Sequence, residues 1–287
     1  MKKNSIGQKI LHFPLTRIVL GVIVILGLFT ISQTLLYNLA NSLNLKGNAM
    51  HIVGSAIPAI LCLFTYILFF RWYEKRSVNE LALKHSDKHL FWGFIIGVIL
   101  QALTIAVIYF TGGYTIVSIN HYSYKFPALI MAFATAITEE ILLRGILFRI
   151  LEEKLGSYIA LGISALVFGL LHLANPNSSL IAALGLAVQA GVLLGATYIY
   201  TRSLWMPIAL HFAWNFVQSG IFGAAVSGGP AGKSLITSKI EGSTWITGGA
   251  FGPEGSVQAT VFCLFAALFI LYAAKKNNRF ISPFWKA

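Results

Sequence analysis

The sequence predicts an all-α polytopic membrane protein, a bundle of about eight transmembrane helices with both termini inside. The chain is 57% hydrophobic and 10% charged, with a mean hydropathy of +0.76, whereas soluble domains average about 25% charged residues. Its apolar residues gather in eight long runs, and its basic residues gather in alternate connections between them. The net charge of +12 therefore reflects membrane topology, and no nucleic-acid partner is expected.

The eight apolar runs have the length of membrane spans, since about 20 residues cross the hydrocarbon core. Lipid offers the backbone no hydrogen bonds, so each run is expected to be a helix. The first run lacks a small-residue cleavage site, which favours an uncleaved span over a signal peptide. The fourth run is longer than a span needs, so a helix followed by an interfacial segment stays open. The runs are residues 18–37, 52–70, 90–110, 126–151, 158–173, 180–200, 206–221 and 257–274.

The distribution of basic residues predicts the orientation of these spans. With the N-terminus inside, 16 of the 21 Lys and Arg residues fall in inside segments and four in outside loops, while Arg144 lies within a span. Lys2 and Lys3 are among the inside residues. This asymmetry supports eight spans with both termini on the cytoplasmic side. No internal repeat of the kind found in inverted-repeat transporters is evident.

The spans divide the chain into four regions. Residues 1–125 hold the N-terminal transmembrane helices and a basic cytoplasmic segment at 71–89, and residues 126–221 form the core that carries the polar motifs. A glycine-rich loop follows at 222–256, and residues 257–287 give the last helix and a basic tail. Cys62 and Cys263 lie in apolar runs and are expected to be buried thiols rather than a disulfide or zinc ligands.

Two adjacent carboxylates in the fourth run are the strongest functional signal. Glu139 and Glu140 are two of only nine acidic residues, and a charge at the centre of a membrane span costs roughly 2.5–3.5 kcal/mol on insertion scales. Glu140 and Arg144 are four residues apart and can pair on one helix face. Glu139 points about 100° away from Glu140, so it is predicted to face a cavity. The simpler reading, a structural ion pair between helices, leaves Glu139 without a partner.

Two later spans carry polar pairs at helical spacing. Phe168 and His172 share a face of the fifth span, and His211 and Asn215 share a face of the seventh. Each pair alone is explained as well by an interfacial histidine or by hydrogen bonding between helices. Three spans with converging Glu, His and Asn side chains, however, could form one polar pocket. Such a pocket can activate a water for acyl transfer, with a carboxylate base and donors for the oxyanion. No GxSxG-like nucleophile is evident.

The order of these motifs resembles a known family. Three motifs follow one another in predicted spans: Glu139-Glu140-x3-Arg144, Phe168-x3-His172 and His211-x3-Asn215. Together they resemble the CPBP (CAAX protease and bacteriocin-processing, Abi-type) intramembrane glutamic endopeptidases. Residues 71–83 and 245–255 also look like those of bacterial members, so the resemblance implies a multi-pass protein of a bacterial cell membrane.

The resemblance also implies roles for the motif residues and a reaction. Glu139 would activate the water with help from His172, and His211 and Asn215 would form the oxyanion hole. The remaining motif residues would orient the site or engage substrate: Glu140, Arg144 and Phe168. The implied activity is hydrolysis of a peptide bond in a membrane-associated peptide or protein, with no cofactor or metal. We expect substrate to reach the site laterally or from the cytoplasmic side.

Other readings of the same residues stay open. Glu139, His172 and His211 could hold a zinc ion with an open position, although no HExxH motif is present. The bundle could instead be a non-catalytic scaffold or immunity protein, since a fold does not fix a function, or a proton-coupled transporter. Glu254, in the glycine-rich loop, is expected to be a solvated residue or a charge at the start of the last helix rather than a catalytic group.

Overall fold

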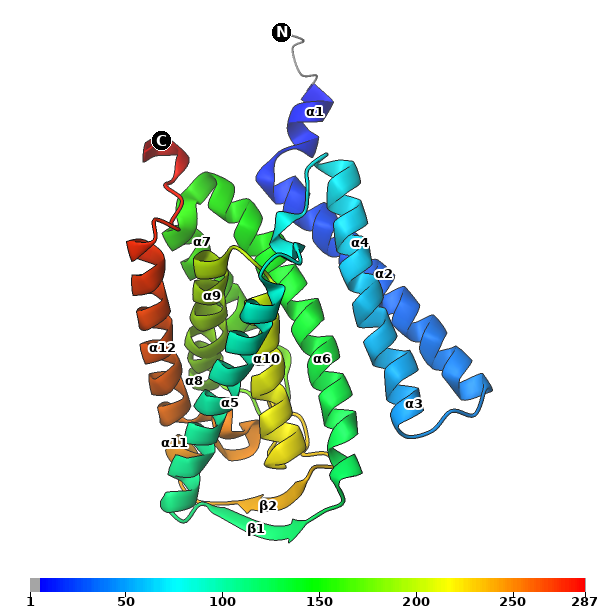
Figure 1. Cartoon of the computed structure of the whole chain (residues 1–287), viewed down its shortest axis with the longest axis vertical. Coiled ribbons are helices and arrows are strands. Elements are labelled where there is room, and N and C mark those ends of the chain that lie inside the picture. Colours follow the sequence, from blue (N-terminus) through cyan, green and yellow to red (C-terminus); the bar gives the residue numbers. More distant parts are fainter. Residues whose placement is uncertain (1–5, 287) are drawn as a thin grey trace.

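A computed structural model describes residues 6–286. All eight predicted spans coincide with helical segments, and the chain is an all-α polytopic membrane protein (Figure 1). Lys2 and Lys3 of the basic N-terminal segment lie outside the described residues. The helices are α1 (Ile6–Leu11), α2 (Pro14–Ser42), α3 (Asn48–His51), α4 (Ile57–Tyr73), α5 (Ser86–Phe110), α6 (Phe126–Glu140), α7 (Arg149–Leu171), α8 (Leu180–Leu186), α9 (Leu193–Thr201), α10 (Trp205–Phe216), α11 (Thr244–Thr247) and α12 (Val257–Lys276).

Three π-helical turns join helices into longer rods, and a fourth extends the end of α10. The turns are Ile52–Ala56, Ile141–Phe148, Ala187–Val192 and Val217–Ile221. The second of them starts directly after Glu140, so α6 continues through it into α7 without the interfacial break that the long fourth run left open. Isolated π-helical turns are frequent at functional sites.

Six helices are long and apolar enough to cross a membrane by length and composition. The difference from eight has two causes. The fourth and fifth predicted spans are continuous over Tyr122–Ala174, but Gly156, whose φ of 75° and ψ of 168° are not helical, divides this stretch into two helices. A Cβ at Gly156 would lie 2.7 Å from the backbone nitrogen of Pro283, so glycine allows both this conformation and the contact. The seventh span, formed by α10 and the turn that follows it, is shorter than the other candidates.

Close helix packing defines the main bundle. The α5 and α10 helices lie against each other nearly backbone to backbone, because a Cβ at Gly93 would lie 2.4 Å from the carbonyl oxygen of Met206 and one at Gly97 would lie 2.6 Å from that of Leu210. Small residues at spacing four are typical of membrane helix interfaces. The α2 and α4 helices stand to one side of this bundle (Figure 1).

The end of the bundle that carries both termini is rich in buried ion pairs. Glu74, after α4, accepts from Arg17 of α2 at 2.7 Å and from Arg149 of α7 at 3.0 Å. Glu80, in the 3₁₀ turn Asn79–Leu81, pairs with Arg76 at 2.7 Å. Burial alone would raise the pKa of Glu80, but the bonds and charge of Arg76 outweigh it and lower that pKa. The basic segment at 71–89 is thus folded onto the bundle.

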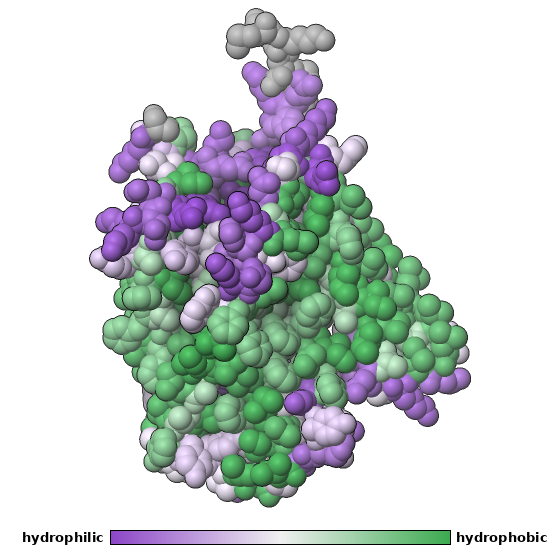
Figure 2. Space-filling view, viewed as in Figure 1, coloured by the Kyte–Doolittle hydropathy of each residue, from purple (hydrophilic) through white to green (hydrophobic). Residues whose placement is uncertain are grey.

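The opposite end is closed by structure that the sequence did not predict. Strand β1 (Tyr114–Ile119) pairs antiparallel with β2 (Ile236–Ile240), and β2 lies within the segment expected to be a glycine-rich loop. Both termini lie at the other end of the molecule (Figure 1). Figure 2 shows hydrophilic residues gathered at the two ends and a hydrophobic belt between them, as expected for a membrane-spanning chain.

Candidate active site

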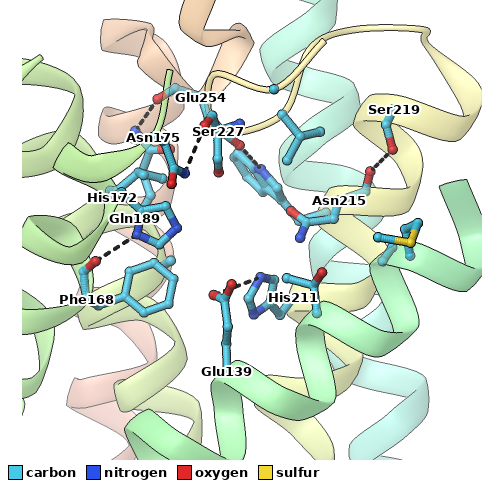
Figure 3. A pocket seen from close by; sticks show the side chains of 18 of the residues that line it. Glu139, Phe168, His172, Asn175, Gln189, His211, Asn215, Ser219, Ser227 and Glu254 are labelled. Carbon is cyan, nitrogen blue, oxygen red and sulfur yellow. Dashed lines mark hydrogen bonds and ion pairs between the residues drawn. The ribbon is translucent and has the colours of Figure 1, made fainter. Parts of the chain in front are cut away.

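A cavity of about 510 Å³ lies within the main bundle. Its walls come from α6, α7, α10 and the α8–α9 rod, and its cover comes from the loops at 175–176, 226–230 and 254. Five of the seven motif residues line it: Glu139, Phe168, His172, His211 and Asn215. Figure 3 shows these side chains projecting into one space from three different helices. The three sequence motifs therefore converge on one cavity, the arrangement that the sequence left open as a possibility.

The other two motif residues form a buried ion pair behind the cavity. Arg144 Nη1 donates to Glu140 Oε1 at 2.8 Å, and both side chains are fully buried. Arg144 Nη2 donates to the carbonyls of Ala190 and Gly191 at 2.6 and 3.1 Å. The guanidinium also lies 5.1 Å from the ring centre of Phe168. The predicted Glu140–Arg144 pairing is confirmed, and removing either partner would leave an unpaired buried charge.

Glu139 is the carboxylate that faces the cavity. Its side chain is 30% exposed, and Oε2 lies 4.0 Å from His211 Nε2. This oxygen has no hydrogen-bond partner within the described chain. The side chain thus reaches the cavity, while Oε2 is a buried oxygen that lacks a protein donor and can accept a hydrogen bond from a water or a substrate group.

His172 is held in one tautomer by the end of α7. Its Nδ1 lies 2.8 Å from the carbonyl oxygen of Phe168, and because a carbonyl only accepts, Nδ1 carries the hydrogen. Neutral His172 therefore presents Nε2 as an unprotonated acceptor. The ring also stacks on that of Phe168 at 4.7 Å between centroids. In Figure 3 this ring and the Glu139 carboxylate lie on facing sides of the same space.

His211 joins the buried ion pair to the open carboxylate. Its Nδ1 lies 3.0 Å from Glu140 Oε1, which as a carboxylate oxygen accepts, so Nε2 is the nitrogen on the Glu139 side. Asn215 follows one turn later on α10 and lines the cavity. Its side-chain amide makes no hydrogen bond to another residue in the part of the chain that the structure describes, so the amide N–H remains available to a ligand.

Glu254 corrects the sequence analysis, because it is neither solvated nor peripheral. Its residue is 1% exposed and lines the same cavity. One oxygen accepts the backbone N–H of Ser227, and the other accepts the indole N–H of Trp214 at 3.4 Å. Its backbone carbonyl accepts from Gln189 at 2.8 Å. Burial raises the pKa of the Glu254 carboxyl, although the Ser227 N–H opposes this shift.

A signal for Glu254 was present in the sequence. Acidic residues are scarce in this chain, and this one is surrounded by glycines. Gly248 and Gly252 have φ of 76° and 111°, and a Cβ at Gly252 would lie 2.3 Å from the carbonyl oxygen of Ala225. These glycines build a compact fold that carries Glu254 into the bundle, rather than a flexible connection.

The position of the cavity affects how substrate can reach it. The α7 helix ends at Leu171, immediately before His172, and the loop after it bonds to the 222–230 segment through Asn175 and Ser227. These loops lie at the end of the bundle opposite the termini (Figure 1). We expected cytoplasmic termini, and substrate access either laterally or from the cytoplasmic side. Because the loops over the cavity lie at the end opposite the termini, cytoplasmic termini would exclude cytoplasmic access and leave lateral access open.

The alternative metal site gains no support from the side-chain positions. Among residues 6–286, no three His, Cys, Asp or Glu side chains are arranged to hold a metal ion. His172 and His211 instead direct one nitrogen each to a Phe168 carbonyl and a Glu140 carboxylate.

Two comparisons with known proteins give matches. Residues 121–217 match the family model described as type II CAAX prenyl endopeptidase Rce1-like. The chain is also similar to "Putative membrane peptidase YdiL" of Bacillus subtilis (strain 168), with 27% identity over 180 residues, 58% of this chain and 71% of that protein. No solved structure gives a significant match. The matched region includes all seven motif residues, and both matches support a multi-pass membrane protein of the CPBP type.

Proposed function

We propose that this protein is an intramembrane endopeptidase that hydrolyses a peptide bond with an activated water and no covalent intermediate. The family match and the relative named as a membrane peptidase support a membrane protease. The observation that carries the mechanism is the cavity in which an open carboxylate, Glu139, lies with the free nitrogens of His172 and His211 and the amide of Asn215.

In the proposed reaction, Glu139 and Nε2 of His172 take one proton from water as its oxygen bonds to the peptide carbonyl carbon. The carbonyl electron pair moves to oxygen, and the oxyanion is stabilised by donors on α10. These donors are the Asn215 amide and Nε2–H of doubly protonated His211, whose Nδ1–H stays on Glu140. The proton then passes to the peptide nitrogen as the C–N bond breaks, releasing a carboxylic acid and an amine.

Glu140 and Arg144 act in this scheme as positioning residues. Their buried pair fixes the rotation of the His211 ring through the 3.0 Å contact between Glu140 and Nδ1, and the Glu140 carboxylate stabilises its positive charge. Arg144 also fixes the α8–α9 rod through the carbonyls of Ala190 and Gly191. Phe168 supports both His172 and Arg144 by ring contacts.

The charge of the cavity indicates a class of substrate. Its lining includes two carboxylates, Glu139 and Glu254, and no Lys or Arg among the described residues. A free C-terminal carboxylate would meet repulsion from these two carboxylates and would find no Lys or Arg partner. We therefore propose an internal peptide bond, with neutral or basic neighbours, in a membrane-associated peptide or protein. The expected partners are the bilayer and this substrate.

The test is cleavage of a membrane-peptide library by purified protein in detergent. Glu139→Gln and His172→Ala should each lower kcat/KM by roughly 10²–10⁴, the range for a general acid or base. Asn215→Ala should lower kcat by about 10²–10³, as for an oxyanion donor. Glu241→Gln, an exposed carboxylate in the loop after β2, is the matched control and should keep wild-type activity.

Two further experiments distinguish the proposed mechanism and substrate from the alternatives. Activity that survives a strong chelator supports the metal-independent mechanism, and activity lost on chelation and restored by zinc contradicts it. Peptides with a C-terminal amide and with a free carboxylate next to the same cleavage site test the charge of the substrate. If wild type cleaves nothing, while Glu139→Gln and His172→Ala variants keep the cellular phenotype, the proposal is wrong and a scaffold role replaces it.

A further inference from the structure

A second cavity, of about 750 Å³, lies at the end of the bundle that carries the termini. It is a groove between α5 and α12, with the α9–α10 junction as its floor. It shares no lining residue with the candidate active site. Figure 2 shows hydrophilic side chains gathered at this end of the molecule above the hydrophobic belt.

One half of the groove is basic. No Asp or Glu belongs to its described lining, while six residues that carry or can carry positive charge do: Lys84, His85, Lys88, His89, Arg202 and Arg279. Arg202 is neutralised by Glu152 at 2.6 Å. His89 is half-buried, and its Nδ1 has no hydrogen-bond partner within residues 6–286.

Three of these cations are unpaired within the described lining of the groove. Lys84, Lys88 and Arg279 form no ion pair in the described part of the chain. The neighbouring arginines, by contrast, are all paired with glutamates: Arg17, Arg76 and Arg149. The four glutamates at this end are already paired with arginines, so they do not neutralise the three free cations of the groove. The nearest further carboxylate in the sequence, Asp87, is not part of the lining.

The other half of the groove is apolar and lies on the membrane-spanning parts of α5 and α12. Its wall is made by five side chains: Ile96, Ala266, Phe269, Ile270 and Ala273. Phe269 is exposed, and Trp92 and Tyr200 stand near the boundary between the two halves. Aromatic residues of this kind mark the headgroup level of a bilayer. A ligand that satisfies both halves must carry a negative charge next to hydrocarbon chains.

We propose that this groove binds an anionic phospholipid, with the phosphate against Lys84, Lys88 and Arg279 and the acyl chains along Phe269 and Ile270. Basic pockets between transmembrane helices on the cytoplasmic side are known binding places for such headgroups. The lipid would contact α5, α12 and the turn between α9 and α10. It would thereby stabilise the helices that pack around α10, which carries His211 and Asn215, at the end of the bundle opposite the active-site loops. The inference does not depend on the proposed protease activity.

The experiment is a lipid titration of the purified protein in detergent, followed by thermal unfolding. Phosphatidylglycerol should raise the midpoint in a saturable way, because a ligand that binds only the folded state stabilises it. Phosphatidylcholine should give a smaller rise. Removing each free cation by K84Q, K88Q or R279Q should weaken phosphatidylglycerol binding about fivefold. The matched triple variant K275Q/K276Q/K286Q removes three exposed cations from the same end but outside the groove and should bind as wild type.

Each contrary outcome overturns the proposal. Equal rises with phosphatidylcholine and phosphatidylglycerol, or an equal loss in the control variant, would show that no specific anionic site exists. An equal rise with glycerol 3-phosphate would show a soluble phosphate site instead of a lipid site. If the triple variant K84Q/K88Q/R279Q fails to fold, the single substitutions decide the result.

Discussion

At the scale of residues, the same side-chain type serves different purposes in this chain according to its surroundings. Glu140 is fully buried and paired with Arg144, Glu139 opens into the cavity, and Glu254 is buried without a Lys or Arg partner in the described chain. Adjacent positions on a helix point in different directions, so Glu139 and Glu140 are separated by geometry. Glu254 reaches the same cavity through tertiary folding.

Glu254 predicts a pH dependence of stability. Burial raises its folded-state pKa above the unfolded value of about 4.3. A raised acid pKa contributes stability below the unfolded pKa that is lost as pH rises through the folded pKa. The thermal unfolding midpoint of wild type should therefore fall as the pH rises from the unfolded-state pKa through the folded-state pKa. Glu254→Gln should reduce this dependence of the midpoint on pH. Glu241→Gln, which removes an exposed carboxylate, should keep it; equal slopes for wild type and Glu254→Gln would contradict the assignment.

At the scale of elements, the site depends on how closely α5 and α10 approach. His211 and Asn215 lie on α10, and the glycines of α5 let α10 settle against the bundle. The π-helical turn that follows Glu140 connects α6, which forms part of the cavity wall, to α7. The positions of the site residues are therefore set by backbone contacts between helices as well as by the residues themselves.

Gly97→Ala tests this packing. The new Cβ would lie 2.6 Å from the Leu210 carbonyl oxygen and 2.8 Å from the Ala213 Cβ, so α10 must shift. Such overpacking typically costs about 1–3 kcal/mol, and activity should fall because α10 carries oxyanion donors. Gly162→Ala in α7, where nothing lies within 4 Å of the new Cβ, is the control. Unfolding midpoints and kcat are the readouts, and a Gly97→Ala variant as stable and active as Gly162→Ala would contradict this packing.

At the scale of the whole molecule, the two ends have different chemistry. The end with the termini holds the ion-pair network and the basic groove, and the other end holds the β1–β2 pair and the loops over the active-site cavity. The positive-inside distribution predicts cytoplasmic termini, so the loops over the cavity are predicted to face outward. The division of the chain into four regions stays a prediction.

The orientation can be tested by cysteine labelling, because both native cysteines are buried. Val117 on β1 is 62% exposed, and Lys286 near the C-terminus is also exposed. A membrane-impermeant maleimide should label Val117→Cys on intact cells and Lys286→Cys only after permeabilisation. The reverse pattern would place the cavity loops inside and restore cytoplasmic access for substrate.

The sequence by itself determined the helical membrane fold, the approximate bounds of all eight helical segments and the Glu140–Arg144 pair. Hydropathy, helix period and i,i+4 spacing are local properties, so they can be read without knowing which segments meet. They also limited the candidate site to three spans, because charged residues within a membrane need partners.

Only the tertiary structure decided the arrangement of these parts. The burial of Glu254, the pairing of β1 with β2, the end of the bundle at which the cavity opens and the basic groove all depend on contacts between residues distant in the chain. Glycine-rich sequence is compatible with both a flexible loop and a compact fold, because it restricts backbone angles little. Which of the two forms depends on packing against other helices, and no local pattern records that packing.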